Sequence, residues 1–206
     1  VKDDGLAAGK GVVVTHDHEE ALAHAKACLV AGSSVVIEEY LDGPEVSLFA
    51  ITDGHFVVPL QPAQDFKRAH DDDAGPNTGG MGAYSPLPWA PSELVEEVTQ
   101  RVLQPMIDAM AARGTPFAGL LYAGLALTSR GVRVVEFNAR FGDPETQVVL
   151  ARLQSGLGGL LMAAATGNLE THPEPVWSTD SAVTVVIAAQ GYPQAPRKGD
   201  VITVLE

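Results

Sequence analysis

The segment of residues 134–145, VVEFNARFGDPE, combines residue types that can hold a magnesium ion beside a phosphate group. The strand predicted over residues 132–138 alternates its side chains between two faces. One face would carry Val132, Val134, Glu136 and Asn138. Because Mg²⁺ prefers oxygen ligands and takes few of them from the protein, Glu136 and Asn138 are candidate metal ligands. Taken alone, the segment fits a polar strand end equally well.

The residues that follow this strand favour an anion. Arg140 could clamp a phosphate through two parallel N–H donors. A turn of Gly, Asp, Pro and Glu then leads into a predicted helix, and the N-terminus of a helix attracts negative charge. The alternative is a capped helix that binds no ligand.

A glycine-rich segment, DGLAAGKG over residues 4–11, suggests a second contact with phosphate. It resembles a P-loop, but it is one residue short, and a glycine stands where Ser or Thr would hold magnesium. A valine-rich segment follows it instead of a helix. A loop of this kind could close over a nucleotide like a lid, with Lys2 and Lys10 reaching the phosphates. The plainer alternative is a glycine-rich hairpin turn.

Residues 35–47, VVIEEYLDGPEVS, place an acidic strand end next to an apolar residue. The backbone of such an edge could pair with an adenine ring. This stretch contains Glu38, Glu39, Tyr40 and Leu41. A carboxylate such as Glu45 could bind the ribose hydroxyls. A solvated acidic edge strand is the alternative.

Residues 62–86 form the most unusual stretch, in which Asp65, Lys67 and Arg68 precede a glycine-rich run. The run begins with Pro76, Asn77, Thr78, Gly79 and Gly80. Glycines let backbone N–H groups approach a ligand closely. A disordered surface loop is the alternative, although the aromatic residues and Met81 favour ordered packing.

Composition excludes several classes of protein. The net charge of −13 argues against a general nucleic-acid surface. No apolar run approaches the roughly 20 residues that cross a bilayer, so no membrane contact is expected. The single cysteine, Cys28, fits a reducing compartment, and we expect a cytoplasmic location. Both ends look like strand interiors, which predicts a piece of a longer protein.

The hydrophobic pattern predicts the elements that must position these groups. Strands over residues 34–40, 45–52 and 55–61 would form an antiparallel meander. Residues 62–91 show little periodicity and predict a long irregular connection. A helix over residues 91–114 would be kinked by Pro105. A hairpin (119–128 and 132–138), two helices (145–154 and 157–166) and a strand (181–189) complete the prediction.

Together these segments resemble the glycinamide ribonucleotide synthetase family of ATP-grasp ligases. The resemblance covers nearly the whole chain, and its most specific motifs are GPNTGGMGAYSP and VEFNxRFGDPETQ. It implies an α+β ATP-grasp fold whose two subdomains hold ATP between them. Residues 1–62 would be part of the small lid subdomain, 63–170 the large subdomain, and 171–206 the start of a truncated C-terminal domain.

The resemblance also implies a reaction. Members of this family join glycine to 5-phosphoribosylamine with ATP and Mg²⁺ or Mn²⁺, through a glycyl phosphate, in purine biosynthesis. The family's N-terminal domain would be missing here, so this chain alone is expected to be inactive. A monomer or weak homodimer is expected. Another ATP-grasp ligase, such as one that phosphorylates bicarbonate, and a non-catalytic nucleotide-binding fragment remain the alternatives.

Site roles follow by motif match. Glu136 and Asn138 would be the metal ligands, and Arg140 and Lys10 would be catalytic. ATP would contact Lys2, Lys10, Glu38, Glu39, Tyr40, Leu41 and Glu45. The other substrates would contact Asp65, Lys67, Arg68, Pro76, Asn77, Thr78, Gly79, Gly80, Asp143 and Glu145.

Overall fold

The computed structural model describes residues 1–5, 12–72 and 74–203 of the chain. The chain forms two compact units, Val1–Asp42 and Gly43–Glu206. The functional boundaries that we placed after residues 62 and 170 stay predictions. Among the described residues, no helix has both the length and the apolar character needed to cross a membrane.

In residues 1–5 and 12–42, the described part of the first unit, the chain forms one helix and a two-stranded antiparallel sheet. Its elements are β1 (Lys2–Asp3), α1 (His18–Val30) and β2 (Val35–Val36). The strand predicted over residues 34–40 is therefore too long, because β1 offers only two residues for pairing. The predicted meander is wrong in its first strand, since β2 pairs with β1.

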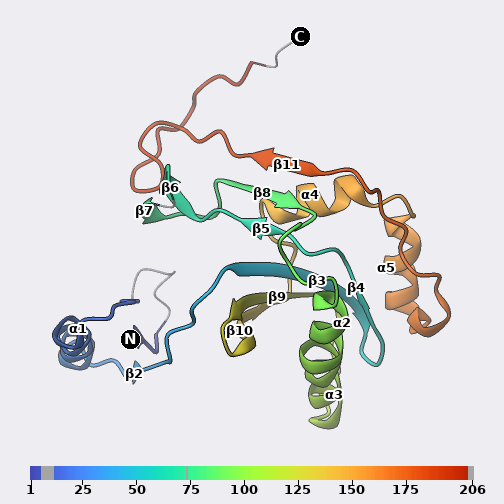
Figure 1. The fold of residues 1–206 in the computed structure, drawn as a ribbon, viewed down its shortest axis with the longest axis horizontal. Coiled ribbons are helices and arrows are strands. Elements are labelled where there is room, and N and C mark those ends of the chain that lie inside the picture. Colours follow the sequence, from blue (N-terminus) through green and yellow to red (C-terminus); the bar gives the residue numbers. More distant parts are fainter. Residues whose placement is uncertain (6–11, 73, 204–206) are drawn as a thin grey trace. The chain divides into compact units, whose positions relative to one another are not determined.

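The second unit is built on a four-stranded antiparallel sheet in the order β10-β9-β3-β4 (Figure 1). Its strands are β3 (Glu45–Asp53), β4 (Val57–Pro59), β9 (Ala118–Thr128) and β10 (Gly131–Asn138). Both predicted hairpins in this sheet are confirmed. β3 turns into β4 because Asp53 accepts hydrogen bonds from the N–H groups of His55 and Phe56.

One face of this sheet is apolar and is covered by helical segments. Val46, Leu48 and Ala50 of β3 are buried there. The covering segments are α2 (Leu94–Val98), a π-helical turn (Thr99–Leu103) and α3 (Gln104–Ala112). The single helix that we predicted is thus divided. At the division the Gln104 N–H bonds the Thr99 carbonyl, immediately before Pro105, which has no N–H to donate.

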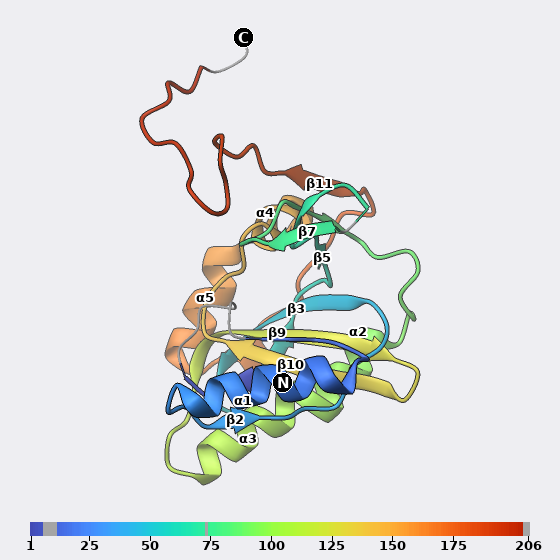
Figure 2. The ribbon, with the colours of Figure 1, turned by 90° about the vertical axis from the view of Figure 1, so that its left-hand side faces the viewer.

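The opposite face of the sheet packs against α4 (Glu145–Arg152) and α5 (Leu157–Thr166) (Figures 1 and 2). Phe49 of β3 and Tyr122 of β9 are buried there together with apolar residues of both helices. Figure 2 shows α3 and α4 on opposite sides of β3 and β9. A 3-10 turn, Leu169–Thr171, follows α5.

The stretch that we expected to be irregular contains four short strands. They are β5 (Gln64–Asp65), β6 (Arg68–His70), β7 (Ala74–Asn77) and β8 (Gly82–Ser85). β8 pairs with β5 on one side and with β11 (Ala182–Val185) on the other, while β6 pairs with β7. The prediction of a long irregular connection is wrong, because pairing orders strands that are too short to show a periodic pattern.

Arg152, at the C-terminal end of α4, fixes this helix to the neighbouring sheet. Its buried guanidinium donates hydrogen bonds to the Ser85 hydroxyl (2.8 Å) and to the carbonyls of Ser178 (3.0 Å) and Asp180 (2.9 Å). Burial lowers the pKa of Arg152. These bonds hold the C-terminal end of α4, and Glu145 lies at its start.

Candidate functional site

The predicted metal ligands lie on β10, whose pairing with β9 contains a bulge. Val134 faces Leu125, whereas Glu136 faces the next residue, Gly124. Val135 is therefore the extra residue, and side chains change face beyond it. Glu136 and Asn138 share a face, as predicted. Our placement of Val132 and Val134 on that same face is wrong, because the bulge reverses the alternation.

Glu136 lies in a row of residues across three strands. Ser47 of β3 faces Gly124 of β9, which faces Glu136 of β10. A Cβ on Gly124 would lie 3.3 Å from Cγ of Glu136 and 3.3 Å from Cε1 of Tyr122. The glycine therefore lets the Glu136 side chain lie against the sheet beside Tyr122.

Glu136 and Asn138 are available to a ligand. Glu136 is exposed and Asn138 is half-buried, and within the described ranges neither side chain has a hydrogen bond or ion pair. No group of three or more His, Cys, Asp or Glu residues in the described chain could hold a metal ion. A carboxylate and a carboxamide oxygen nevertheless suit Mg²⁺, which commonly takes one or two protein ligands and fills the rest with water and phosphate.

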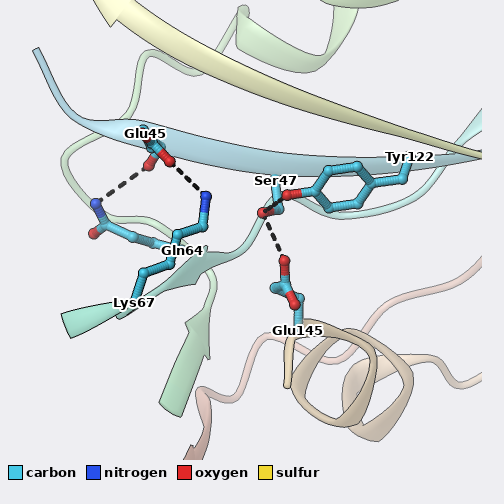
Figure 3. A network of polar contacts seen from close by, with 6 residues as sticks. All are labelled: Glu45, Ser47, Gln64, Lys67, Tyr122 and Glu145. Atoms are coloured by element: carbon cyan, nitrogen blue, oxygen red, sulfur yellow. Dashed lines mark hydrogen bonds and ion pairs between the residues drawn. The ribbon is translucent and has the colours of Figure 1, made fainter. Parts of the chain in front are cut away.

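A chain of buried hydrogen bonds lies on the same face of the sheet (Figure 3). The Ser47 hydroxyl donates to the Glu145 carboxylate (2.9 Å) and lies 2.9 Å from the Tyr122 hydroxyl. Because Ser47 has one proton and gives it to Glu145, Tyr122 must be the donor to Ser47. Burial, with a further contribution from the nearby carboxylate of Glu145, raises the pKa of Tyr122 to about 12.

Glu145, which the sequence suggested for substrate binding, is only 4% exposed at the start of α4. Its bond to Ser47 joins the turn before α4 to β3, and its direct contact with a ligand stays a prediction. Sequence reasoning missed Ser47 and Tyr122. Ser47 could have been found as a hydroxyl within a strand whose neighbours are almost all apolar.

A charged cluster lies at the start of β3, on β5 and just after β5. Lys67 Nζ lies 2.7 Å from Oε2 of Glu45, so a predicted substrate contact is paired with the predicted ribose contact (Figure 3). Burial raises the pKa of Asp65 to about 6, the Lys67 charge opposes this rise, and the carboxylates of Glu145 and Glu45 add to it. Burial alone would lower the pKa of Lys67, but its hydrogen bond to Glu45 and the charge of Asp65 raise it.

The glycine loop, residues 76–80, begins with the last two residues of β7 and reaches the turn before α4. The N–H and hydroxyl of Thr78 both donate to the Lys67 carbonyl, at 2.7 and 2.9 Å. A Cβ on Gly80 would lie 2.4 Å from Cδ of Pro144. The loop therefore contacts the turn that carries Asp143 and Glu145.

The remaining residues predicted for the large unit lie near its surface. Arg140 is exposed and donates to the Phe141 carbonyl (3.1 Å). Asp143 is exposed and accepts a hydrogen bond from Gln147 (2.7 Å). Arg68 donates to the Gly75 carbonyl, which closes the β6–β7 hairpin. Pro76 and Asn77 end β7.

The predicted ATP contacts of the first unit are partly paired with one another. Lys2 Nζ lies 3.0 Å from Oε2 of Glu38. The Tyr40 ring lies 4.9 Å from the His16 ring. Glu39 is exposed, and Leu41 is half-buried. Lys10 lies outside the described residues.

Comparison with known families decides which family contains this site. Residues 1–146 match the family described as "Phosphoribosylglycinamide synthetase, ATP-grasp (A) domain". The chain belongs to this phosphoribosylglycinamide synthetase family. The match includes β10 with Glu136 and Asn138, and it ends within the first turn of α4. The family resemblance read from the sequence is confirmed.

Relatives within the phosphoribosylglycinamide synthetase family match the chain along its length. A phosphoribosylamine–glycine ligase of Streptomyces coelicolor is 72% identical over 206 residues, which are 100% of this chain and 49% of the relative. One from Mycobacterium tuberculosis is 61% identical over 202 residues, 98% of this chain and 48% of the relative. The chain spans about half the length of the curated relatives that it matches.

Solved structures show the fold of this family member. The phosphoribosylamine–glycine ligase of Thermotoga maritima superimposes with a TM-score of 0.85 at 37% identity, over 100% of this chain and 53% of that one. A biotin carboxylase domain of Hydrogenobacter thermophilus, in complex with MgADP and bicarbonate, gives a TM-score of 0.52 at 15% identity, over 83% and 35% of the two chains. The predicted ATP-grasp fold is confirmed.

Proposed function

We propose that the protein containing this chain joins glycine to 5-phosphoribosylamine with ATP. The carrying observation is the match to a phosphoribosylamine–glycine ligase at 72% identity along the whole chain. In this reaction a glycine carboxylate oxygen bonds to the γ-phosphorus, and the bond from that phosphorus to ADP breaks. The amine nitrogen then bonds to the acyl carbon and loses a proton, while inorganic phosphate leaves.

Glu136 and Asn138 would hold Mg²⁺ or Mn²⁺ beside the ATP phosphates. Two observations support this. Both side chains lie on one face beyond the β10 bulge, and among the described residues their oxygen atoms have no protein partner. The distant biotin carboxylase structure contains MgADP. When bound, the ion would neutralise phosphate charge, which is most of what phosphoryl transfer requires from an enzyme.

Cationic and polar side chains would position the nucleotide. Arg140, exposed beyond the end of β10, would bind the transferred phosphate, and Lys2 and Lys10 would contact the other phosphates. The adenine edge would be residues 38–41, and Glu45 would bind the ribose. Binding of this kind accelerates the reaction by positioning and charge stabilisation, so no nucleophilic side chain is required.

The glycine loop and the neighbouring cluster would bind glycine and the amine. Lys67 and Arg68 would supply cationic donors, and the loop of residues 76–80 would line the site beside them. Asp65 suits the proton that the amine loses, because a carboxylate whose pKa is raised to about 6 is a stronger base than an ordinary one. Asp143, exposed beside the loop, would contact the same substrates.

The test measures ADP release by the full-length protein with each substrate omitted in turn. The proposal expects release that requires both glycine and 5-phosphoribosylamine. Release that requires bicarbonate instead of glycine would favour a carboxylating ATP-grasp ligase. No release under any of these conditions would favour a nucleotide-binding protein without this activity.

Glu136→Ala tests the metal assignment in the full-length protein. Turnover should fall by about 100-fold or more, because even indirect partners of metal ligands cost 10–100-fold when they are removed. Binding of Mn²⁺, followed by calorimetry in the presence of ADP, should weaken in parallel. The unfolding midpoint should stay unchanged because Glu136 is exposed. Glu174→Gln, which changes an exposed carboxylate outside the site, is the control. Turnover at the wild-type rate in Glu136→Ala would refute the metal assignment.

A further inference from the structure

The glycine loop is contacted by a residue from the C-terminal segment of the chain. The Gly79 N–H donates a hydrogen bond to the Tyr192 hydroxyl, at 3.0 Å, although the two residues are 113 positions apart. Tyr192 is half-buried, whereas Gly79 is exposed. A Cβ on Gly79 would lie 3.4 Å from the same hydroxyl oxygen. The loop and the tyrosine are therefore in close contact.

The backbone N–H groups of residues 78–81 differ in where their acceptors lie. Those of Thr78 and Met81 bond the carbonyls of Lys67 and Phe66, and that of Gly80 bonds the Thr78 hydroxyl. These three acceptors all lie within residues 66–78, close to the loop in the sequence. The N–H of Gly79 alone among the four has an acceptor from a distant part of the chain.

A self-bonded turn presents Tyr192 to the loop. The Ala195 N–H donates to the Gly191 carbonyl (2.8 Å), and the Tyr192 N–H donates to the Ala189 carbonyl (3.1 Å). Gly191 has a φ of +85°, and a Cβ there would lie 2.4 Å from the Ala195 carbonyl oxygen. Only glycine fits this position, so the sequence specifies the turn and with it the place of the tyrosine.

The other side of the glycine loop touches the candidate site. Gly80 packs against Pro144, in the turn that leads to Glu145. Thr78 holds the backbone of Lys67, whose side chain pairs with Glu45. The loop therefore contacts Pro144 on one side of the site and the backbone of Lys67 on the other.

We propose that Tyr192 is a positioning residue that holds the glycine loop ready for the phosphate group of the amine substrate. The chemistry fits, because Arg68 uses one guanidinium nitrogen to bond the Gly75 carbonyl and has further donors that suit a phosphate. While it accepts from Gly79, the tyrosine keeps its own proton to donate to a phosphate oxygen. This inference rests on the proposed function.

Tyr192→Phe in the full-length protein tests the inference, because it removes the hydroxyl and keeps the ring. The KM for 5-phosphoribosylamine should rise about threefold to tenfold, the cost of one hydrogen bond. The KM for ATP and kcat should change by less than about twofold. A loss confined to kcat, or an equal rise in the KM for ATP, would contradict the positioning role.

Hydrogen exchange gives a readout that does not depend on activity. The Gly79 amide should exchange about fivefold faster or more in Tyr192→Phe, because its acceptor is lost. Gly191→Ala should produce the same two changes by displacing the turn. Gln194→Ala, at an exposed residue of the same turn, is the control and should produce neither.

The two proposals fail in distinguishable ways. If wild-type full-length protein shows no ADP release that depends on glycine and the amine, the proposed function fails, and the exchange rates still test the contact. If wild type shows that release while Tyr192→Phe keeps both its KM for the amine and the exchange rate of Gly79, the role of Tyr192 is refuted.

Discussion

Removing the Ser47 hydroxyl should cost more stability than its size suggests. In the wild type, Tyr122 donates to Ser47 and Ser47 donates to Glu145, all within the buried layer between the central sheet and α4. Ser47 is 2% exposed and Glu145 is 4% exposed, so water cannot readily replace the lost partner. Ser47→Ala would leave a carboxylate without its donor and a phenol without its acceptor.

The magnitude follows from these two broken bonds. A hydrogen bond to a charged group contributes about 1.5–3 kcal/mol, and a buried polar group left without a partner costs about 1–3 kcal/mol. Ser47→Ala should therefore destabilise the second unit by about 3–5 kcal/mol. That is a large part of the roughly 5–15 kcal/mol by which a domain is stable.

Native-state hydrogen exchange of the β3 and β9 amides in the full-length protein measures this loss as an opening free energy. Ser47→Ala/Tyr122→Phe should cost no more than Ser47→Ala alone, because the second change removes the phenol that the first leaves without an acceptor. Ser155→Ala, which removes an exposed hydroxyl bonded to the Val176 N–H, is the control and should cost about 1 kcal/mol or less. Additive effects within about 0.5 kcal/mol would refute a coupled chain.

Two further substitutions test the cluster and the loop. Asp65, with its folded pKa raised to about 6, contributes stability that is complete below its unfolded pKa of about 3.9 and is lost as pH rises through about 6. Asp65→Asn should therefore gain stability relative to wild type as pH rises across this window, measured by unfolding at several pH values; a constant difference would contradict the raised pKa. Gly80→Ala should cost about 2 kcal/mol or more, because its Cβ would meet Pro144. Gly114→Ala has a positive φ but open space, so an equal cost in both variants would rule out the contact.

The shared face of Glu136 and Asn138 was predictable from the sequence, but the placement of the residues before them was not. Glu136 and Asn138 are two positions apart and both lie beyond the bulge, so alternation places them on one face whatever precedes them. Val132 and Val134 lie before the bulge. Nothing in the side-chain pattern marks Val135 as the extra residue, because it is one valine among several.

The sequence pattern could not predict contacts between segments that are far apart in the chain. Ser47 meets Tyr122 and Glu145 only through the register of β3 with β9 and through the packing of α4. The strands β5–β8 have two to four residues each, too few for a period to appear. Their glycines and prolines favoured loops locally, and pairing with neighbouring strands overrode that preference.

The turn before α4 is where the separately predicted groups meet. Glu145 links this turn to β3 through its hydrogen bond with Ser47, and Pro144 packs against Gly80 of the glycine loop. The loop in turn is bonded to Tyr192. At its far end α4 is held by Arg152, which donates to the Ser85 hydroxyl. The glycine loop, this turn and β3 are thus joined by a continuous series of contacts through Pro144, Glu145 and Ser47.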